Sequence, residues 1–182
     1  RRLQAENDRL DLAVKERTEE IESQKKKIEA QRNEILNSVN YAAFIQCAAL
    51  TPSEQVDAIF PENFIIYKPC SIVSGDFYWI GQVDDKSVCV VGDCTGHGVP
   101  GGFMSMLGMS FLSDIIGKET NPAEILQQLR KRVKANLHQT GDFGVSQDGM
   151  DISVCVIDER TKHMVYAGAY NSVVIVRNGE MY

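Results

Sequence analysis

One segment of this 182-residue chain, residues 87–102, constrains the fold more than any other. A run of β-favouring residues leads into Asp93, a glycine-rich turn containing His97 follows, and an apolar helical stretch begins after the turn. A corner of this kind holds a charged side chain rigidly at the end of a sheet. Asp76 lies in a shorter segment of the same type, residues 74–79. Two carboxylates displayed in this way predict a site for hard cations.

The predicted ligands suit Mn²⁺ or Mg²⁺, which prefer oxygen donors in octahedral geometry. Asp93 can bridge two ions, Asp76 supplies a second carboxylate, and the backbone carbonyl of Cys94 is a candidate further ligand. Two metal ions at one site lower the pKa of a bound water and clamp a phosphoryl oxygen. Support for the turn is expected from Gly75, Gly96, His97 and Gly98.

The sequence allows two roles for each of two further residues, His97 and Asp151. His97 stands between glycines, so it either acts as a general acid or fixes the tight turn by hydrogen bonding, and its place in the loop favours the second role. Asp151 begins a predicted strand. It either approaches the metal site or serves as a turn residue, which is the commoner role of a carboxylate at a strand start.

Residues 96–101 also match the G-x-G-x-x-G pattern of dinucleotide-binding folds. Pro100 lacks the N–H that would face a pyrophosphate, and no strand–helix–strand return with an acidic residue about twenty positions later is visible. A nucleotide site is therefore the weaker interpretation of this turn.

The order of the predicted elements indicates the fold class. The expected strands are residues 64–67, 76–83, 87–91, 152–157, 164–169 and 173–176, and the expected helices are residues 101–116 and 122–137. Asn121 and Pro122 form a typical helix start, residues 139–150 form a polar loop, and Asn178-Gly179 is a strong hairpin signal. Because strands come in blocks with the helices between them, we expect an α+β protein with antiparallel sheets and helices packed outside.

The N-terminal segment predicts a long helix, because residues 1–41 contain no proline or glycine. Val14, Ile21, Ile28 and Ile35 repeat every seven residues, whereas the complementary positions become polar after Leu10. β-Branched residues at this position favour a parallel two-stranded coiled coil, so we predict a homodimer through residues 3–39. A solvated single helix is the alternative. The expected organisation is a helical dimerisation and signalling linker over residues 1–50, a connector over 51–62 and a globular part over 63–182.

The bulk composition limits the partners and the compartment. The formal net charge of −6 disfavours binding to nucleic acid or to an anionic membrane. No uninterrupted apolar run approaches the roughly 20 residues that span a bilayer, so no direct membrane insertion is expected. Five cysteines without a C-x-x-C pair predict reduced, mostly buried thiols in a cytoplasmic protein. The chain begins in a helical pattern without Met, so we expect an upstream sensor domain in a longer protein.

The two aspartate segments together resemble a known family. Residues 74–79 (SGDFYW) and 91–98 (VGDCTGHG) are similar to the paired signatures of the metal-dependent Ser/Thr protein phosphatases of the PPM superfamily, and most similar to the bacterial SpoIIE/RsbU-like branch. Residues 166–171 (YAGAYN) resemble the family's Asn-Ala-Gly-His-Asn segment, which extends the likeness over most of residues 40–182.

The resemblance implies a β-sandwich flanked by helices, a Mn²⁺ or Mg²⁺ pair, and hydrolysis by a metal-activated water. It also implies a substrate that carries phosphoserine or phosphothreonine, such as an anti-sigma-factor antagonist, and control by a sensor through a helical dimer. Asp76 and Asp93 match the family's metal aspartates, and Cys94 stands where the family usually has valine or a small residue.

One departure from the family is expected to weaken the site. The family's remaining metal carboxylates lie in a later Asp-Gly motif and a final Asp-Asp or Asp-Asn motif, and neither occurs before Tyr182. The residues 63–182 therefore match the N-terminal portion of the phosphatase domain, and we expect this chain to bind metal weakly and to have little activity. The alternative function is a catalytically inactive, phosphatase-like dimeric interaction module.

Overall fold

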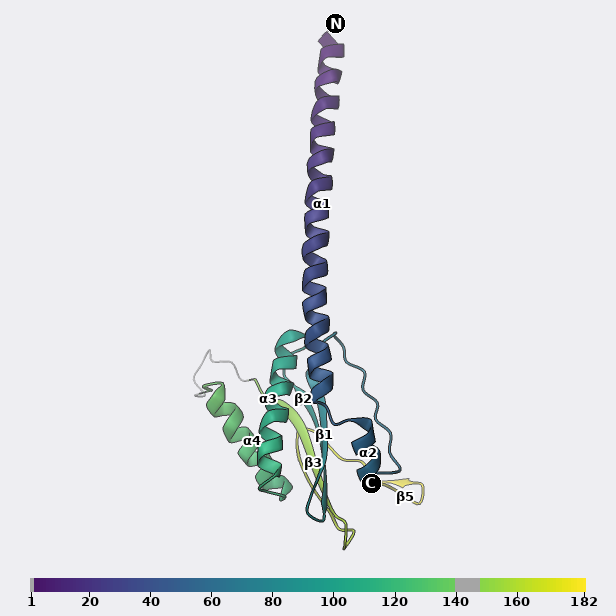
Figure 1. The fold of residues 1–182 in the computed structure, drawn as a ribbon, viewed down its shortest axis with the longest axis vertical. Coiled ribbons are helices and arrows are strands. Elements are labelled where there is room, and N and C mark those ends of the chain that lie inside the picture. Colours follow the sequence, from purple (N-terminus) through teal and green to yellow (C-terminus); the bar gives the residue numbers. More distant parts are fainter. Residues whose placement is uncertain (1, 140–147) are drawn as a thin grey trace. The chain divides into compact units, whose positions relative to one another are not determined.

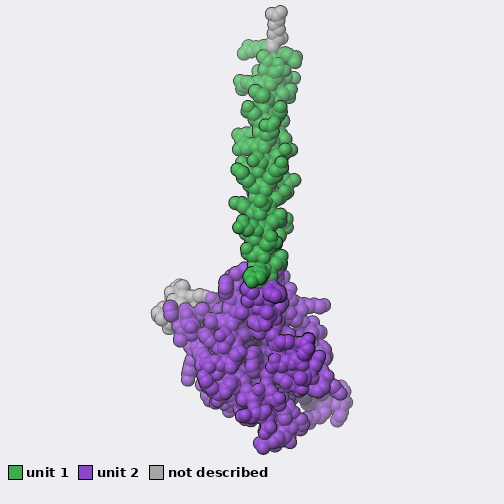
Figure 2. Space-filling model, in the orientation of Figure 1, with its two compact units in different colours: residues 1–41 green, residues 42–182 purple. Residues whose placement is uncertain are grey.

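The computed structural model describes residues 2–139 and 148–182 and divides the chain into two compact units (Figures 1 and 2). Unit 1 is Arg1–Tyr41 and unit 2 is Ala42–Tyr182. The predicted loop over residues 139–150 falls largely on residues 140–147, which lie outside the described residues.

The N-terminal helix α1 runs without a break over Arg2–Ala49, so it contributes the described residues of unit 1 and the first residues of unit 2. This confirms that the segment without proline or glycine is helical. Ile21, Ile28 and Ile35 are each 62–63% exposed in the single chain. The heptad positions therefore form an apolar stripe that the described residues do not cover. Gln46, in the last turns of α1, is the buried residue of this helix.

The centre of unit 2 is a four-stranded antiparallel sheet in the order β1-β2-β3-β4. Its strands are β1 (Asp76–Val83), β2 (Lys86–Cys94), β3 (Met150–Asp158) and β4 (Met164–Ala169). A two-residue turn at Asp84 and Asp85 joins β1 to β2, and Asp84 adopts a positive φ of 52° there. Along β2, Val88, Val90 and Cys94 alternate into the core.

Two helices, α3 (Val99–Ile116) and α4 (Pro122–Asn136), cover the core-facing side of this sheet (Figure 1). Leu112 and Ile116 of α3 are fully buried against strand residues such as Val154. By length and composition α3 could also cross a membrane, but half of it is buried in the fold, as expected of a core helix. The predicted cap of α4 is confirmed, because the Asn121 side chain accepts hydrogen bonds from the first-turn amides.

Three local predictions need correction. The expected strand over residues 64–67 is not a strand, since this segment pairs with no other strand among the described residues. The connector contains a short helix, α2 (Ser53–Ile59), because Val56 is buried as α2 packs beside β1. The cysteines are all unpaired, but only Cys94 is buried, so the expectation of mostly buried thiols is wrong.

The hairpin signal at the C-terminal end is confirmed. Asn178 (φ 55°) and Gly179 (φ 81°) form the turn between β5 (Val176–Arg177) and β6 (Glu180–Met181). The strand before the turn is shorter than predicted. As a whole, the α+β prediction of an antiparallel sheet flanked by helices and preceded by a long helix is confirmed. In the described residues the second sheet consists of the β5-β6 hairpin alone.

Candidate metal site

The strand register brings three aspartates together on one face of the sheet. Asp76 of β1 lies opposite Asp93 of β2, and Asp93 lies opposite Asp151 of β3. Residues opposite each other on neighbouring strands project to the same side of a sheet. Asp151, which the sequence left between a turn residue and a site residue, thus stands in the same row as the two predicted ligands.

The hydrogen-bond pattern of the ladder sets the spacing within this row. Cys94 N donates to Gly75 O (3.3 Å), so the adjacent pair Asp76–Asp93 is of the non-hydrogen-bonded type, in which the Cα atoms are only about 4.5 Å apart. Thr95 N donates to Gly149 O (3.0 Å), so Thr95 and Gly149 form a hydrogen-bonded pair. Such pairs recur every second residue, so Asp93 and Asp151 also form one, and their Cα atoms are farther apart. The closest carboxylates are therefore those of Asp76 and Asp93.

The electrostatics of Asp93 reflect this crowding. Desolvation raises the pKa of Asp93, and the charge of Asp76, a hydrogen bond with Asp76 and the charge of Asp151 raise it further. None of the ion pairs found in the described part of the chain includes any of these three aspartates. Within the described residues, the row is a concentration of negative charge that no ion pair balances.

Side chains hold both backbone groups of Asp76. Its amide donates to Ser74 Oγ (2.9 Å), and its carbonyl accepts from the Tyr67 hydroxyl (3.1 Å). Ser74 Oγ also lies 3.4 Å from Asp76 Oδ2. Sequence reasoning did not assign roles to Tyr67 or Ser74. A serine two residues before an aspartate is a recognisable signal for this local bond, whereas nothing local marks Tyr67.

The glycine-rich turn approaches β1 very closely. A Cβ at Gly75 would lie 2.8 Å from Gly96 O and 2.9 Å from Cys94 O, so only glycine fits there. Gly96 and Gly98 adopt positive φ angles of 88° and 66°, which favour glycine. Two hydrogen bonds join Thr95 of the turn to Gly149. Thr95 N donates to Gly149 O, and Thr95 Oγ1 accepts from Gly149 N (3.1 Å).

Cys94 can offer the candidate site its backbone carbonyl but not its thiol. Its side chain is 3% exposed and packs in the core, and burial followed by the charges of Asp93 and Asp76 raises its pKa to about 12. A thiol that stays protonated is a poor metal ligand. The carbonyl oxygen of Cys94 is the atom that suits a hard cation.

His97 is exposed and makes no hydrogen bond to another residue that the structure describes. Its expected role in fixing the turn by hydrogen bonding therefore lacks support from the structure. The positive φ angles of the glycines and the contacts of Thr95 hold the turn instead.

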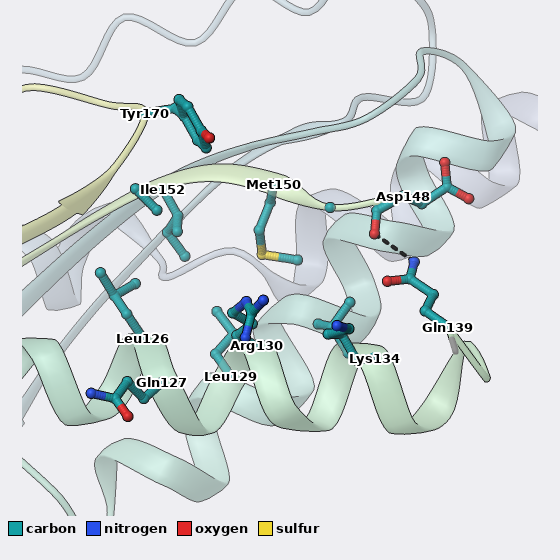
Figure 3. A pocket seen from close by; sticks show the side chains of 13 residues that line it. Leu126, Gln127, Leu129, Arg130, Lys134, Gln139, Asp148, Met150, Ile152 and Tyr170 are labelled. Atoms are coloured by element: carbon teal, nitrogen blue, oxygen red, sulfur yellow. Dashed lines mark hydrogen bonds between the residues drawn. The ribbon is translucent and has the colours of Figure 1, made fainter. Parts of the chain in front are cut away.

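Two of the hollows formed by described residues lie on opposite sides of the sheet. One, of about 550 Å³, contains Asp76 and Asp93 and is bounded by residues 63–68 and by Tyr78 and Val91. The other, of about 620 Å³, lies between α4 and β3, with Leu126, Arg130 and Met150 on its walls (Figure 3). The larger hollow is mainly apolar and lacks the aspartate row, so we place the candidate site in the smaller one.

The donor set fits a hard divalent cation. A cation would relieve the repulsion between Asp76 and Asp93, and carboxylate and carbonyl oxygens are its preferred ligands. No three described His, Cys, Asp or Glu side chains converge closely enough to surround an ion by themselves. The remaining coordination positions would have to come from the Cys94 carbonyl, water or further carboxylates.

Comparison with known proteins identifies the family. The family model for Stage II sporulation protein E (SpoIIE) matches residues 84–181, more than half of the chain. The chain belongs to the SpoIIE family. The matched stretch contains Asp93, the glycine-rich turn and Asp151 of this SpoIIE-family chain, and Asp76 lies before it. The resemblance noted from the two sequence motifs is confirmed.

One solved structure agrees with this assignment. The SiaA-PP2C domain of Pseudomonas aeruginosa is similar with a TM-score of 0.68 and 33% identity, over 77% of this SpoIIE-family chain and 55% of that chain. The chain thus spans about half the length of that relative. A Stage II sporulation E family protein from Thermanaerovibrio acidaminovorans is less similar, with a TM-score of 0.42 and 21% identity over 50% of this chain and 43% of that one. No curated protein matched the chain.

SpoIIE and PP2C-like proteins are signalling phosphatases that generally use Mn²⁺ or Mg²⁺. In this SpoIIE-family chain the structure places Asp76 and Asp93 side by side and adds Asp151 to the row. The Cys94 thiol is buried, and the His97 side chain is exposed.

The raised pKa of Asp93 predicts how stability depends on pH in the metal-free protein. In the folded state Asp93 stays protonated at pH values above its ordinary pKa of 3.8. The free energy of unfolding therefore falls as the pH rises from this ordinary pKa through the raised pKa of the folded state. Asp93→Asn should therefore stabilise the metal-free protein at neutral pH and have no such effect in strong acid. Because Asp93 is exposed, solvent screening limits the gain to about 1 kcal/mol or less.

Urea unfolding of the two proteins with a chelator present, at several pH values, measures this effect. Glu62→Gln, at an exposed carboxylate outside the aspartate row, should not change the stability. A metal-free Asp93→Asn protein that is less stable than the wild type at neutral pH would contradict the electrostatic description of the row.

Proposed function

We propose that this chain is the metal-binding part of a protein-serine/threonine phosphatase in bacterial signalling. One observation carries the proposal: a SpoIIE-family chain places Asp76 and Asp93 directly opposite each other on adjacent strands. A close pair of carboxylates that no described cation balances is costly for the fold, and it serves a function when a metal ion is bound.

The proposed cofactor is Mn²⁺ or Mg²⁺, with two ions in a complete domain. Asp76, Asp93 and the Cys94 carbonyl would hold metal, and Asp151 is close enough in register to add a carboxylate or to orient a bound water. When bound, the ions would lower the pKa of a water molecule and polarise a phosphoryl oxygen. The chain's own residues fix the positions of these oxygens through Ser74, Tyr67 and Thr95.

The proposed substrate is a phosphoserine or phosphothreonine on a regulatory protein of the anti-sigma-factor-antagonist type. Family membership supports this class of substrate. The charge of the chain agrees with it, because residues 37–182 hold ten basic and sixteen acidic side chains and cannot attract bare phosphate without metal. The competing function, an inactive phosphatase-like interaction module, has no specific observation in its favour.

We predict slow hydrolysis of p-nitrophenyl phosphate by the 182-residue chain, dependent on Mn²⁺. Asp93→Asn should lower this rate by about 100-fold or more, because it removes a charge that holds the metal. A chelator should abolish the rate, and added Mn²⁺ should restore it. Asp85→Asn changes an exposed carboxylate in the β1–β2 turn and should leave the rate unchanged.

Each outcome bears on a different claim. Hydrolysis that is insensitive to both Asp93→Asn and the chelator would contradict the proposed phosphatase function. A rate equal to that of a relative with the complete set of acidic motifs would contradict the expectation that the later carboxylates are needed.

We also propose that residues 3–39 form a parallel homodimer that connects an upstream sensor domain to the phosphatase part in the cytoplasm. Support comes from the isoleucines at heptad positions, which are mostly exposed in the single chain. Exposed apolar side chains at a seven-residue spacing are typical of a coiled-coil seam.

The dimer can be tested by light scattering at high protein concentration. The wild type should have twice the mass of the monomer, and the double variant Ile21→Lys/Ile28→Lys should be monomeric because two charges enter the seam. Ser23→Lys/Ala30→Lys places the same charges at the same spacing two residues later, outside the seam, and should remain dimeric. A monomeric wild type would contradict the proposed linker dimer.

A further inference from the structure

The hollow between α4 and β3 is a cavity apart from the aspartate row (Figure 3). Its volume of about 620 Å³ lies within the range of roughly 300–1,000 Å³ that is typical of pockets for small molecules. Most of its wall is apolar, with the side chains of Leu126, Leu129, Met150 and Ile152 around it. Ligand pockets in proteins combine such walls with a few polar groups that orient the ligand.

Strand β3 separates this hollow from the aspartate row. Met150 and Ile152 line the hollow, and Asp151 between them points to the other face of the sheet, because successive side chains of a strand alternate. The ring of Tyr170, just after β4, stands at the edge of the hollow and is 97% exposed, so it can cover a bound molecule (Figure 3). Such a molecule would lie on the opposite side of β3 from the candidate metal ligands.

Two cationic side chains stand on the α4 wall of this apolar hollow. Leu126, Arg130 and Lys134 recur every four residues, so they lie along one face of the helix. Figure 3 shows Arg130 and Lys134 on the side of α4 that faces Met150. Arg130 is exposed and Lys134 is half-buried. Neither takes part in an ion pair found in the described part of the chain.

An arginine next to this face of α4 is, in contrast, compensated within the protein. Arg132 Nη1 pairs with Asp114 Oδ2 of α3 (2.6 Å). Among the described residues Asp148 is the acidic one that lines the hollow, and its carboxylate points away from Arg130 and Lys134 (Figure 3). A half-buried ammonium beside apolar walls loses part of its hydration, so a bound anion would recover free energy. The hollow thus combines an apolar surface with two adjacent positive charges.

We propose that this hollow binds a small amphipathic anion: a free organic acid with an apolar body and one carboxylate, sulfonate or phosphate group. The apolar body would pack against Leu126, Met150 and Ile152, and the anionic group would lie beside Arg130 and Lys134. A free acid suits the hollow better than the headgroups of an anionic membrane, because the net charge of −6 repels such a surface. This site is separate from the proposed metal-dependent function and goes beyond it.

The experiment uses decanoate as the probe and nuclear magnetic resonance of isotope-labelled methionine methyl groups as the readout. The chain contains six methionines, and the Met150 signal is assigned through its loss in Met150→Leu. Decanoate below its micelle-forming concentration should shift the Met150 signal in a saturable way and leave the signals of Met164 and Met181, which do not line the hollow, unchanged. A chelator is present throughout, so that the result does not depend on a bound metal ion.

Matched controls isolate the contribution of the two charges. Decanol has the same apolar body without the charge and should bind about 10-fold more weakly or less, and Arg130→Gln/Lys134→Gln should weaken decanoate binding by about 10-fold or more. Lys26→Gln/Lys131→Gln removes the same charge at exposed positions outside the hollow and should change the affinity by no more than about twofold. An unchanged signal of the buried Met109 shows that each variant keeps its core.

Four results would each overturn the proposal. They are the absence of a saturable Met150 shift in the wild type, equal binding of decanol and decanoate, equal weakening by the two double variants, and binding to phosphatidylglycerol vesicles without binding of free decanoate. Because the chelator keeps metal out of every sample, none of these results bears on the aspartate row, and the proposed phosphatase function would stand.

Discussion

Repulsion between Asp76 and Asp93 is the constraint on which the rest of the site depends. Strand pairing holds the two carboxylates opposite each other in the closer type of antiparallel pair, and Asp151 extends the row. Desolvation raises the pKa of Asp93, and the neighbouring charges of Asp76 and Asp151 raise it further. A protein that needed only stability would have placed a cation or an apolar residue in this row, so the arrangement is best explained by an external cation.

The surrounding structure keeps the carboxylates from moving apart. The ladder between β1 and β2 fixes their backbones, Ser74 and Tyr67 bind the backbone groups of Asp76, and Thr95 ties the glycine-rich turn to the start of β3. Helices α3 and α4 pack the opposite face of the sheet and leave the aspartate face open. Gln46, near the end of α1, bonds to both backbone groups of Ser74.

Sequence patterns predicted those parts of the fold that depend on local signals. The bounds of β1 and β4, the Asn121 cap and the Asn178-Gly179 turn follow from alternation and turn chemistry, and each is observed. Residues 64–67 have strand-like composition but no partner, and composition alone cannot supply one. The proximity of Asp151 to Asp93 and the bonds of Gln46 to Ser74 join residues 58 and 28 positions apart, so only the tertiary structure reveals them.

If the aspartate row binds a divalent cation, a crystal of this chain soaked in Mn²⁺ should hold an ion there. Anomalous scattering at the manganese edge locates the ion without reference to activity. We expect a peak within coordination distance, about 2.0–2.4 Å, of carboxylate oxygens of both Asp76 and Asp93. Density at other surface carboxylates with none at this pair would contradict it.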